Sequence, residues 1–93
     1  MWRVLEHRTL PKQLRKVPVT VLKRYEKWKD IVCLSGPNGL RLIKGFRDES
    51  LLGDWHGFRS SRLSQKYRVI YKVEADNILV KVIKVTNHDY RQH

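Results

Sequence analysis

Two arginines on either side of a short turn form the clearest candidate site for chemistry in this sequence. Arg62 and Arg68 flank residues 64–66, a predicted hairpin turn. If the hairpin is centred on Gln65, the two arginines are cross-strand partners on one face of a sheet. Like charges directly opposite each other destabilise a sheet. A fold tolerates this where an anion lies between the guanidinium groups; the alternative is solvated guanidinium groups or salt bridges to nearby carboxylates.

The candidate residues around this pair include all the groups needed to cleave an RNA strand without a metal. Such a reaction needs a base for the proton of the 2′-OH, an acid for the departing 5′ oxygen, and cations for the charged phosphorane. The candidates are Glu49 or Asp48 as the base, His88 or Tyr90 as the acid, and Arg62, Arg68, Lys44, Arg59 and Lys66 as the cations. The structural alternatives are that Glu49 is a surface carboxylate beside Arg47 and that His88 is an ordinary exposed residue.

Other kinds of site are poorly supported. The histidines are scattered through the chain: His7, His56, His88 and His93. No Cys, His or carboxylate group has the spacing of metal ligands, and no glycine-rich phosphate loop or Ser-His-Asp arrangement is present. We therefore expect neither a metal nor another cofactor. His56 is either a second proton donor or a loop residue, and we favour the loop.

The single cysteine bears on the compartment rather than on chemistry. Cys33 lies among apolar residues and is interpreted as a core residue that fills space. No intrachain disulfide can form, which fits a reducing compartment, and we expect the protein in the cytoplasm. The apolar stretches are too short for a membrane span.

The charge of the chain indicates the class of its ligand. Its 93 residues include 20 Lys and Arg against nine Asp and Glu, a formal net charge of +11. A polyanion is the favoured ligand, because each neutralised phosphate releases condensed counterions. The alternative is a basic surface that serves solubility alone.

The elements that must position these residues begin with a strand and two helices, within one domain over residues 1–93. Trp2–Glu6 is predicted as a short strand from its alternating pattern. Thr9 is the expected N-cap of a short helix that ends before Pro18. A second helix is predicted over residues 19–34 from apolar residues spaced by three and four: Leu22, Tyr25, Trp28 and Val32. Turn residues at 35–39 are expected to end the helical part.

The second half of the chain is predicted to be a sheet. Strands are expected over residues 40–43, 58–63, 67–73 and 78–85, with a polar loop over 45–57 and a turn at 74–77. The last strand is apolar on both faces apart from Lys81 and Lys84, as expected of a central strand. The order of elements predicts an α+β domain: an N-terminal strand, two helices packed on the sheet, and an antiparallel β-meander.

The same residues carry a resemblance to a known family. Residues 52–63 and 67–71 have the sequences LGDWHGFRSSRL and YRVIY. They resemble the hallmark strand and hairpin of the RelE/ParE toxin superfamily. The segments 10–12, 25–28 and 84–90 are also similar to that family. The resemblance covers essentially the whole chain and implies a RelE-like β-α-α-β-β-β fold.

This resemblance implies the toxin of a bacterial type II toxin–antitoxin pair. RelE-branch members enter the ribosomal A site and cleave mRNA there, by attack of the 2′-OH on the adjacent phosphate. Arg68 matches the family arginine that contacts the scissile phosphate, and Glu49 matches the catalytic glutamate of YoeB-like members. His88 lies near the C-terminal histidine of YoeB- and YafQ-like members, and Tyr90 near the RelE tyrosine. The acid is therefore His88, Tyr90 or His56.

The resemblance also implies partners and two alternatives. An acidic antitoxin is expected to mask the basic face around Arg62 and Arg68, and the substrate is mRNA on the ribosome, next to ribosomal RNA. Operator DNA is expected to be contacted only through the antitoxin complex. One alternative is a ParE-like toxin of the same fold that inhibits DNA gyrase. The other is a non-catalytic RNA- or DNA-binding protein, in which charge alone acts.

Overall fold

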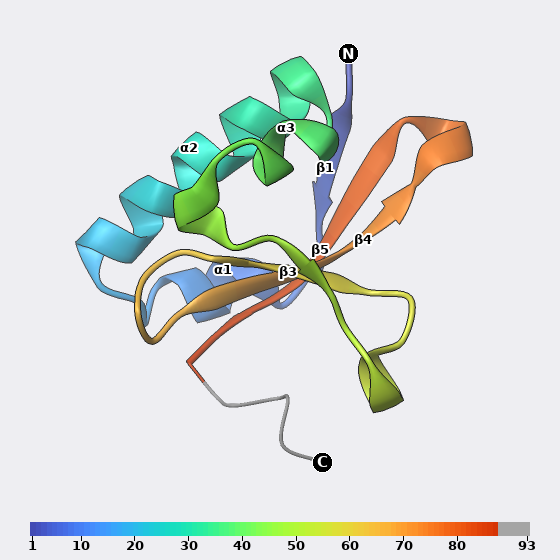
Figure 1. The fold of residues 1–93 in the computed structure, drawn as a ribbon. Coiled ribbons are helices and arrows are strands. Elements are labelled where there is room, and N and C mark those ends of the chain that lie inside the picture. Colours follow the sequence, from blue (N-terminus) through green and yellow to red (C-terminus); the bar gives the residue numbers. More distant parts are fainter. Residues whose placement is uncertain (88–93) are drawn as a thin grey trace.

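A five-stranded sheet with helices on one face is the framework of the molecule; a computed structural model describes residues 1–87 (Figure 1). The helices are α1 (Leu10–Leu14), α2 (Val19–Ser35) and α3 (Asn38–Arg41). The strands are β1 (Arg3–Glu6), β2 (Glu49–Ser50), β3 (Arg59–Arg62), β4 (Arg68–Glu74) and β5 (Leu79–Thr86). Three 3-10 turns lie between them: η1 (Lys44–Phe46), η2 (Gly53–Trp55) and η3 (Ala75–Asn77). The predicted α+β class is confirmed.

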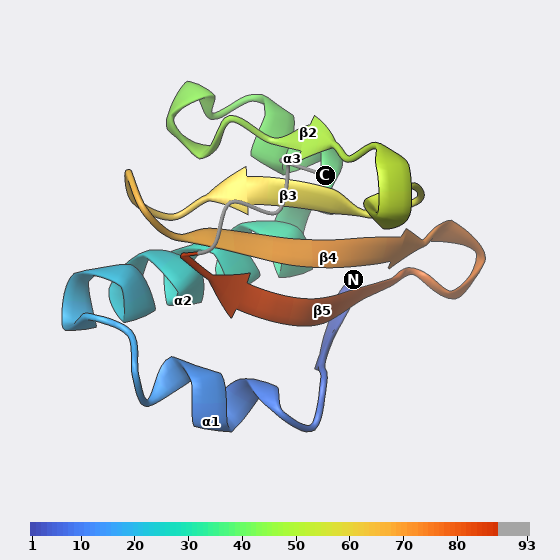
Figure 2. The same ribbon diagram turned by 90° about the horizontal axis from the view of Figure 1, so that it is seen from below.

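The sheet is mixed, with the strand order β1-β5-β4-β3-β2. Strands β2 to β5 are antiparallel neighbours, as the predicted meander requires, and β1 pairs with β5 in parallel. Strand β5 lies between β1 and β4, so the prediction of a central strand is confirmed. Figure 2 shows β3, β4 and β5 side by side, with α2 behind them.

The face of the sheet opposite α2 is here called the open face. Cross-strand partners share a face, and the register therefore assigns polar residues to it in two rows. One row runs across the sheet through Arg62, Arg68 and Thr86, and the next through Glu49, Ser60, Ile70 and Lys84. No helix of the described part of the chain covers this face (Figure 2).

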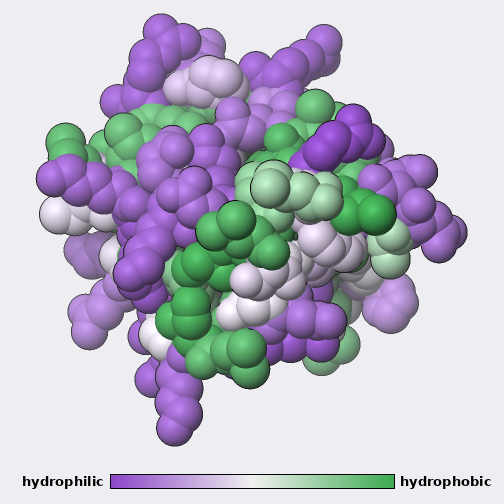
Figure 3. All heavy atoms as spheres, turned by 90° about the horizontal axis from the view of Figure 1, so that it is seen from above, coloured by the Kyte–Doolittle hydropathy of each residue, from purple (hydrophilic) through white to green (hydrophobic). Residues whose placement is uncertain are grey.

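Helix α2 packs on the other face through one apolar stripe, Val21, Tyr25, Trp28 and Val32, each at most 2% exposed. The prediction had Leu22 in place of Val21. The mean spacing of the four stripe residues is closer to the 3.6 residues of a helical turn when the stripe begins at Val21 than when it begins at Leu22. Val21 therefore lies on the same face as the other three. Figure 3 shows the helical side of the molecule, where apolar patches lie among hydrophilic side chains.

Helix α1 begins where it was expected, although its cap differs. Thr9 occupies the N-cap position without bonding the helix backbone through its side chain. Its Oγ1 instead accepts a hydrogen bond of 3.1 Å from Nε2 of Gln13. Pro11 stands in the first turn, where its missing N–H is not needed.

Residues 35–46 contradict the prediction. The helical part does not end at 35–39, because Pro37 starts a new helical turn, α3, and the expected strand at 40–43 does not form. Residues 40–43 are apolar apart from Arg41, and a strand was predicted there. Leu40 is fully buried while Leu42 is 86% exposed, so only one of the two belongs to the core. The predicted polar loop over 45–57 also contains the short strand β2.

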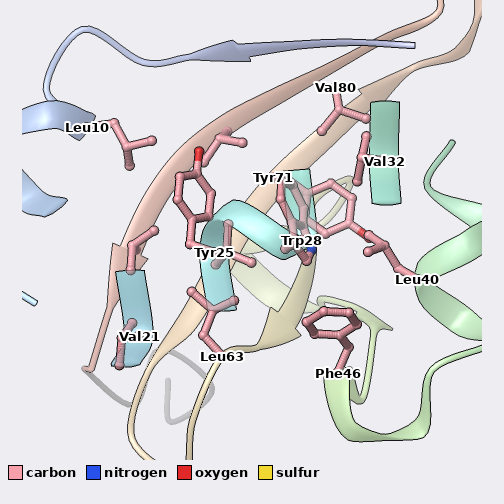
Figure 4. Packing of buried hydrophobic residues seen from close by; sticks show 13 residues of the cluster. Leu10, Val21, Tyr25, Trp28, Val32, Leu40, Phe46, Leu63, Tyr71 and Val80 are labelled. Carbon is pink, nitrogen blue, oxygen red and sulfur yellow. The ribbon is translucent and has the colours of Figure 1, made fainter. Parts of the chain in front are cut away.

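Aromatic rings form the centre of the core between α2 and the sheet (Figure 4). The ring centroids of Trp28 lie 5.8 Å from Tyr25 and 5.2 Å from Tyr71. Nε1 of Trp28 donates a 2.9 Å hydrogen bond to Oγ of Ser61 on β3. These contacts fix α2 across β3 and β4, the two strands that carry the candidate arginines.

Candidate functional site

The arginine pair lies on the open face in the predicted register. Arg62 on β3 is the cross-strand partner of Arg68 on β4, and Arg68 is in turn opposite Thr86 on β5. The two guanidinium groups therefore start from neighbouring positions on one surface. The sequence-based prediction of this hairpin is confirmed.

Arg68 is held by three acceptors. Its Nε donates to Oγ of Ser60 at 3.1 Å, and its Nη2 donates to the backbone oxygen of Arg47 at 3.1 Å. The same Nη2 lies 3.4 Å from Oε2 of Glu49. The Arg68 side chain is only 11% exposed, whereas that of Glu49 is 39% exposed. The cation is thus fixed in place next to a carboxylate that solvent and ligands can reach.

The segment that carries Glu49 is anchored on both sides. Before it, Arg47 closes η1 through a hydrogen bond from its N–H to the oxygen of Lys44, and adopts a φ of 42°, which is uncommon for a residue with a Cβ. This left-handed turn points the Arg47 carbonyl at Arg68. After it, β2 pairs Glu49 with Ser60 on β3.

Arg62 has an unmet hydrogen-bonding requirement. Its Nε is buried and lacks a hydrogen-bond partner within residues 1–87. A buried donor without a partner costs about 1–3 kcal/mol, and more when the group is charged. Together with the cross-strand Arg68, this donor makes the surface suited to an anion, the first of the two alternatives that the sequence left open.

Asp48, the other candidate base, points to the opposite face. Its side chain is fully buried and accepts hydrogen bonds from Arg59, Ser61 and Tyr71. The distances are 2.7 Å to Nη2 of Arg59 and 2.8 Å to Oγ of Ser61. Burial, and then the hydrogen bond to Asp48, raise the pKa of Tyr71 well above its usual value. Asp48 thus connects β3 and β4 inside the core, and it is Glu49 that faces outward.

The Arg59 side chain lies on the same face of the sheet as Asp48, not on the open face with Arg68. Besides Asp48, it donates from Nη1 to Oγ of Ser50 at 2.6 Å. Burial lowers the pKa of Arg59, but the hydrogen bond and charge of Asp48 outweigh it, and the net shift is upward. Arg59, one of the five predicted cations, therefore points away from the arginine pair.

The remaining predicted residues lie at the margins. Lys44 is exposed in η1, and Lys66 is exposed in the turn that joins β3 and β4. His56 is exposed directly after η2, as the loop interpretation expected. His88 and Tyr90 lie outside the described residues.

Three open-face residues were not among the candidates. Ser60 holds Arg68, Thr86 lies opposite Arg68, and Lys84 lies opposite Ile70 in the next row. Lys84 was recognised in the sequence only as an interruption of an apolar strand. The register of β4 against β5 is what adds it to the site, and an irregularity between Ile70 and Tyr71 shifts that register.

Residues 1–87 contain neither a cluster of metal ligands nor a membrane-spanning helix. No group of three or more His, Cys, Asp and Glu side chains lies close enough together to hold a metal ion. No helix in this range has the length and apolar character needed to cross a membrane.

The whole fold matches solved toxins of toxin–antitoxin systems. RelE of Pyrococcus horikoshii, solved in an archaeal RelE–RelB complex, is 26% identical with a TM-score of 0.74, over 96% of this chain and 97% of that one. A YafQ variant of E. coli is 17% identical with a TM-score of 0.68, over 95% and 94% of the two chains. YoeB of Staphylococcus aureus, from a heterotetrameric YoeB–YefM complex, is 15% identical with a TM-score of 0.69, over 95% and 98%.

No protein-family model matches the sequence, and no curated protein matches it significantly. The structural matches, by contrast, extend over nearly the full length of both chains in every pair. The overall fold thus agrees with the resemblance in the sequence. The chain has the RelE-like toxin fold, the fold shared by the RelE, YafQ and YoeB toxins.

Proposed function

We propose that this chain is the toxin of a type II toxin–antitoxin pair and cleaves mRNA on the ribosome without a metal. The observation that carries the proposal is the contact between Arg68 and Glu49, 3.4 Å apart on the open face. Beside it lies Arg62, whose Nε has no partner in the described part of the chain. A phosphate bound by the two arginines would lie next to a carboxylate that can accept a proton.

In this mechanism Glu49 is the general base. It takes the proton from the 2′-OH, whose oxygen attacks the adjacent phosphorus and displaces the 5′ oxygen of the next nucleotide. Arg68 and Arg62 bind the phosphate and stabilise the additional negative charge of the phosphorane. The three contacts that hold Arg68 support this role, since a cation fixed in advance stabilises the transition state without reorganising.

The acid that protonates the 5′ oxygen is proposed to be His88 or Tyr90. Thr86, the cross-strand partner of Arg68, precedes His88 by two positions in the sequence. General acid catalysis contributes roughly 10²–10⁴-fold to such a reaction. His56 is the less favoured donor, because it follows η2 rather than the strands that carry the arginine pair.

The proposed partner is an acidic antitoxin that covers the basic open face. RelE of P. horikoshii was solved with RelB, and the S. aureus YoeB with YefM, which supports a protein partner for this chain as well. A net charge of +11 favours fast association with an acidic protein. Operator DNA would be contacted through the antitoxin.

Primer extension on a translated message tests the reaction. We expect cleavage by the parent protein and a loss of roughly 10²-fold or more for Glu49→Gln, Arg68→Ala and the variant of whichever of His88 and Tyr90 is the acid. Suitable controls are Glu26→Gln and Arg8→Ala, which change an exposed carboxylate and an exposed guanidinium elsewhere. Both controls should cleave like the parent.

Three outcomes would contradict the proposal. If the parent leaves the message intact but blocks DNA supercoiling by gyrase, the protein is a ParE-like toxin on the same fold. If it does neither and binds RNA or DNA with an affinity that falls steeply with salt, it is a binding protein. Cleavage by Arg68→Ala at the parental rate would show that the active site lies elsewhere.

A further inference from the structure

Two aromatic rings on the open face belong to no part of the proposed mechanism. Trp55 ends η2, and Phe58 directly precedes β3. Their ring centroids lie 5.4 Å apart, and their planes meet at 89°, an edge-to-face arrangement. Both rings are partly buried. Trp55 lies within residues 52–63, the segment that carries the family resemblance.

The two rings rest on a small apolar base next to the arginine site. This base consists of Leu51 and Ile70, at most 4% exposed, and it is separate from the core under α2. Ile70 follows Arg68 by two positions on β4, and Leu51 follows Glu49 by two positions. Two residues of a strand span about 7 Å. The rings therefore lie about one nucleotide from the phosphate site, along both strands.

Two lysines approach the rings. Nζ of Lys84 lies 5.9 Å from the ring centroid of Trp55, and Nζ of Lys72 lies 5.6 Å from that of Phe58. These are loose cation–π contacts, near the limit of about 6 Å. Flexible ammonium groups at this distance can move from a ring to a phosphate when a nucleotide binds.

The chemistry of this surface favours RNA over a protein partner. Lysine is depleted at the centres of protein interfaces. Sites for single-stranded nucleic acid instead combine aromatic rings, on which bases stack, with cations that follow the backbone. The surface has both, beside a proposed phosphate site.

We propose that Trp55, supported by Phe58, stacks on one unpaired nucleobase of the RNA strand, next to the phosphate bound by Arg68. Lys84 and Lys72 bind further backbone phosphates near that base. The inference rests on the proposed function, since it takes the substrate to be single-stranded RNA. It adds a base-binding subsite, and with it a source of preference among nucleotides adjoining the cleaved bond.

The test is binding of a short single-stranded RNA carrying 2′-O-methyl groups throughout. This probe lacks the attacking hydroxyl, so affinity is measured without cleavage, by fluorescence anisotropy of a labelled strand. Trp55→Leu keeps an apolar side chain over Leu51 and Ile70 but has no aromatic face. We expect it to bind roughly 5- to 150-fold more weakly, as the loss of one stacked base predicts. Trp55→Tyr should recover most of the affinity.

A second series moves a single abasic nucleotide along the same probe. At one position the parent should lose affinity by a similar factor, while Trp55→Leu should bind the intact and the abasic strand equally. The matched control is Leu52→Ala, an 81% exposed residue just before η2, which should behave as the parent. A urea midpoint for Trp55→Leu close to the parental value shows that the variant is folded.

The stacking proposal is overturned if Trp55→Leu binds as the parent does, if no abasic position affects the parent, or if the parent does not bind the probe. Failure of the proposed function would be distinguishable from failure of the stacking proposal. If the parent discriminates the abasic strand but cleaves no translated message, the subsite stands and the nuclease does not. If the parent cleaves and Trp55→Leu matches it in affinity and in rate, the nuclease stands without this subsite.

Discussion

At the scale of single residues, two adjacent carboxylates have opposite surroundings. Asp48 lies inside the core with Arg59, Ser61 and Tyr71, and Glu49 lies on the open face with Arg68. Because neighbouring side chains along an extended chain point to opposite faces, one residue can hold the strands together while the next one reacts. Asp48 therefore supports the proposed base through the backbone that they share.

Removal of the Asp48 carboxylate should destabilise the fold. Asp48→Ala leaves the Arg59 guanidinium without its ion pair and leaves two buried hydroxyl groups, of Ser61 and Tyr71, without their acceptor. Breaking a buried pair in this way costs about 3–5 kcal/mol. Urea unfolding measures the change, with Asp30→Ala on the exposed side of α2 as the control. A loss below 1 kcal/mol would mean that the network contributes little.

The buried tyrosines predict a loss of stability at alkaline pH. Burial, followed by hydrogen bonding to a carboxylate, raises the pKa of both Tyr25 and Tyr71 above the ordinary value of 10.0. Above pH 10 an unfolded chain releases these protons and the folded chain keeps them, so unfolding becomes easier by about 1.4 kcal/mol per pH unit for each group. Tyr71→Phe should be less stable at neutral pH but lose stability less steeply between pH 10 and 11. Urea unfolding at each pH measures both; the parental slope in Tyr71→Phe would contradict the argument.

At the scale of elements, local signals predicted more than long-range pairing did. The hairpin that brings Arg62 opposite Arg68 follows from the turn at 64–66 and from strict alternation, and both are local. The parallel pairing of β1 with β5 joins opposite ends of the chain, and nothing in either segment indicates it. Strand β2, with two residues, is too short to leave a pattern.

In the candidate site, too, local signals predicted more than long-range pairing did. Arg68, Arg62 and Glu49 come together, because two of them are set by the hairpin and the third by a resemblance that covers its position. Arg59 lies three positions before Arg62 in one strand, so alternation already places it on the opposite face. What the sequence did not indicate is its partner there, Asp48. Lys84 was missed because its row is set by the irregular pairing of β4 and β5.

Substitutions of two glycines at the ends of elements test how closely the neighbouring residues pack there. Gly36 ends α2 with a φ of +74°, and a Cβ there would lie 2.6 Å from Nε1 of Trp2; Gly53 begins η2 with a φ of +63° and open space around it. Gly53→Ala should therefore cost only the left-handed conformation, about 1–2 kcal/mol. Gly36→Ala should cost about 1–3 kcal/mol more, because Trp2 must move. Thermal and urea unfolding compare the two; equal losses would mean that Trp2 adapts freely.

At the scale of the whole molecule, positive charge is not confined to the open face. Lys12 on α1 and Lys27 on α2 are exposed on the helical elements, and Figure 3 shows hydrophilic side chains around much of that side. The net charge of +11 therefore attracts RNA to the molecule without choosing a face. What distinguishes the open face is the arrangement of its cations: an Nε of Arg62 that is buried without a partner among residues 1–87, a fixed Arg68, and Lys84 in the next row.

The salt dependence of RNA binding distinguishes attraction by the total charge from binding at the open face. For a single strand, the slope of log affinity against log salt is about −0.7 for each phosphate contact. If the open face binds the strand, Arg62→Gln and Lys84→Gln should each make the slope shallower by about 0.7, while Lys12→Gln and Lys27→Gln should leave it unchanged. Anisotropy titrations of a 2′-O-methyl RNA from 50 to 200 mM salt, roughly the range over which such contacts are lost, measure all four. Equal changes in all four variants would mean that the strand samples the whole surface, and the protein would then act on RNA through its total charge.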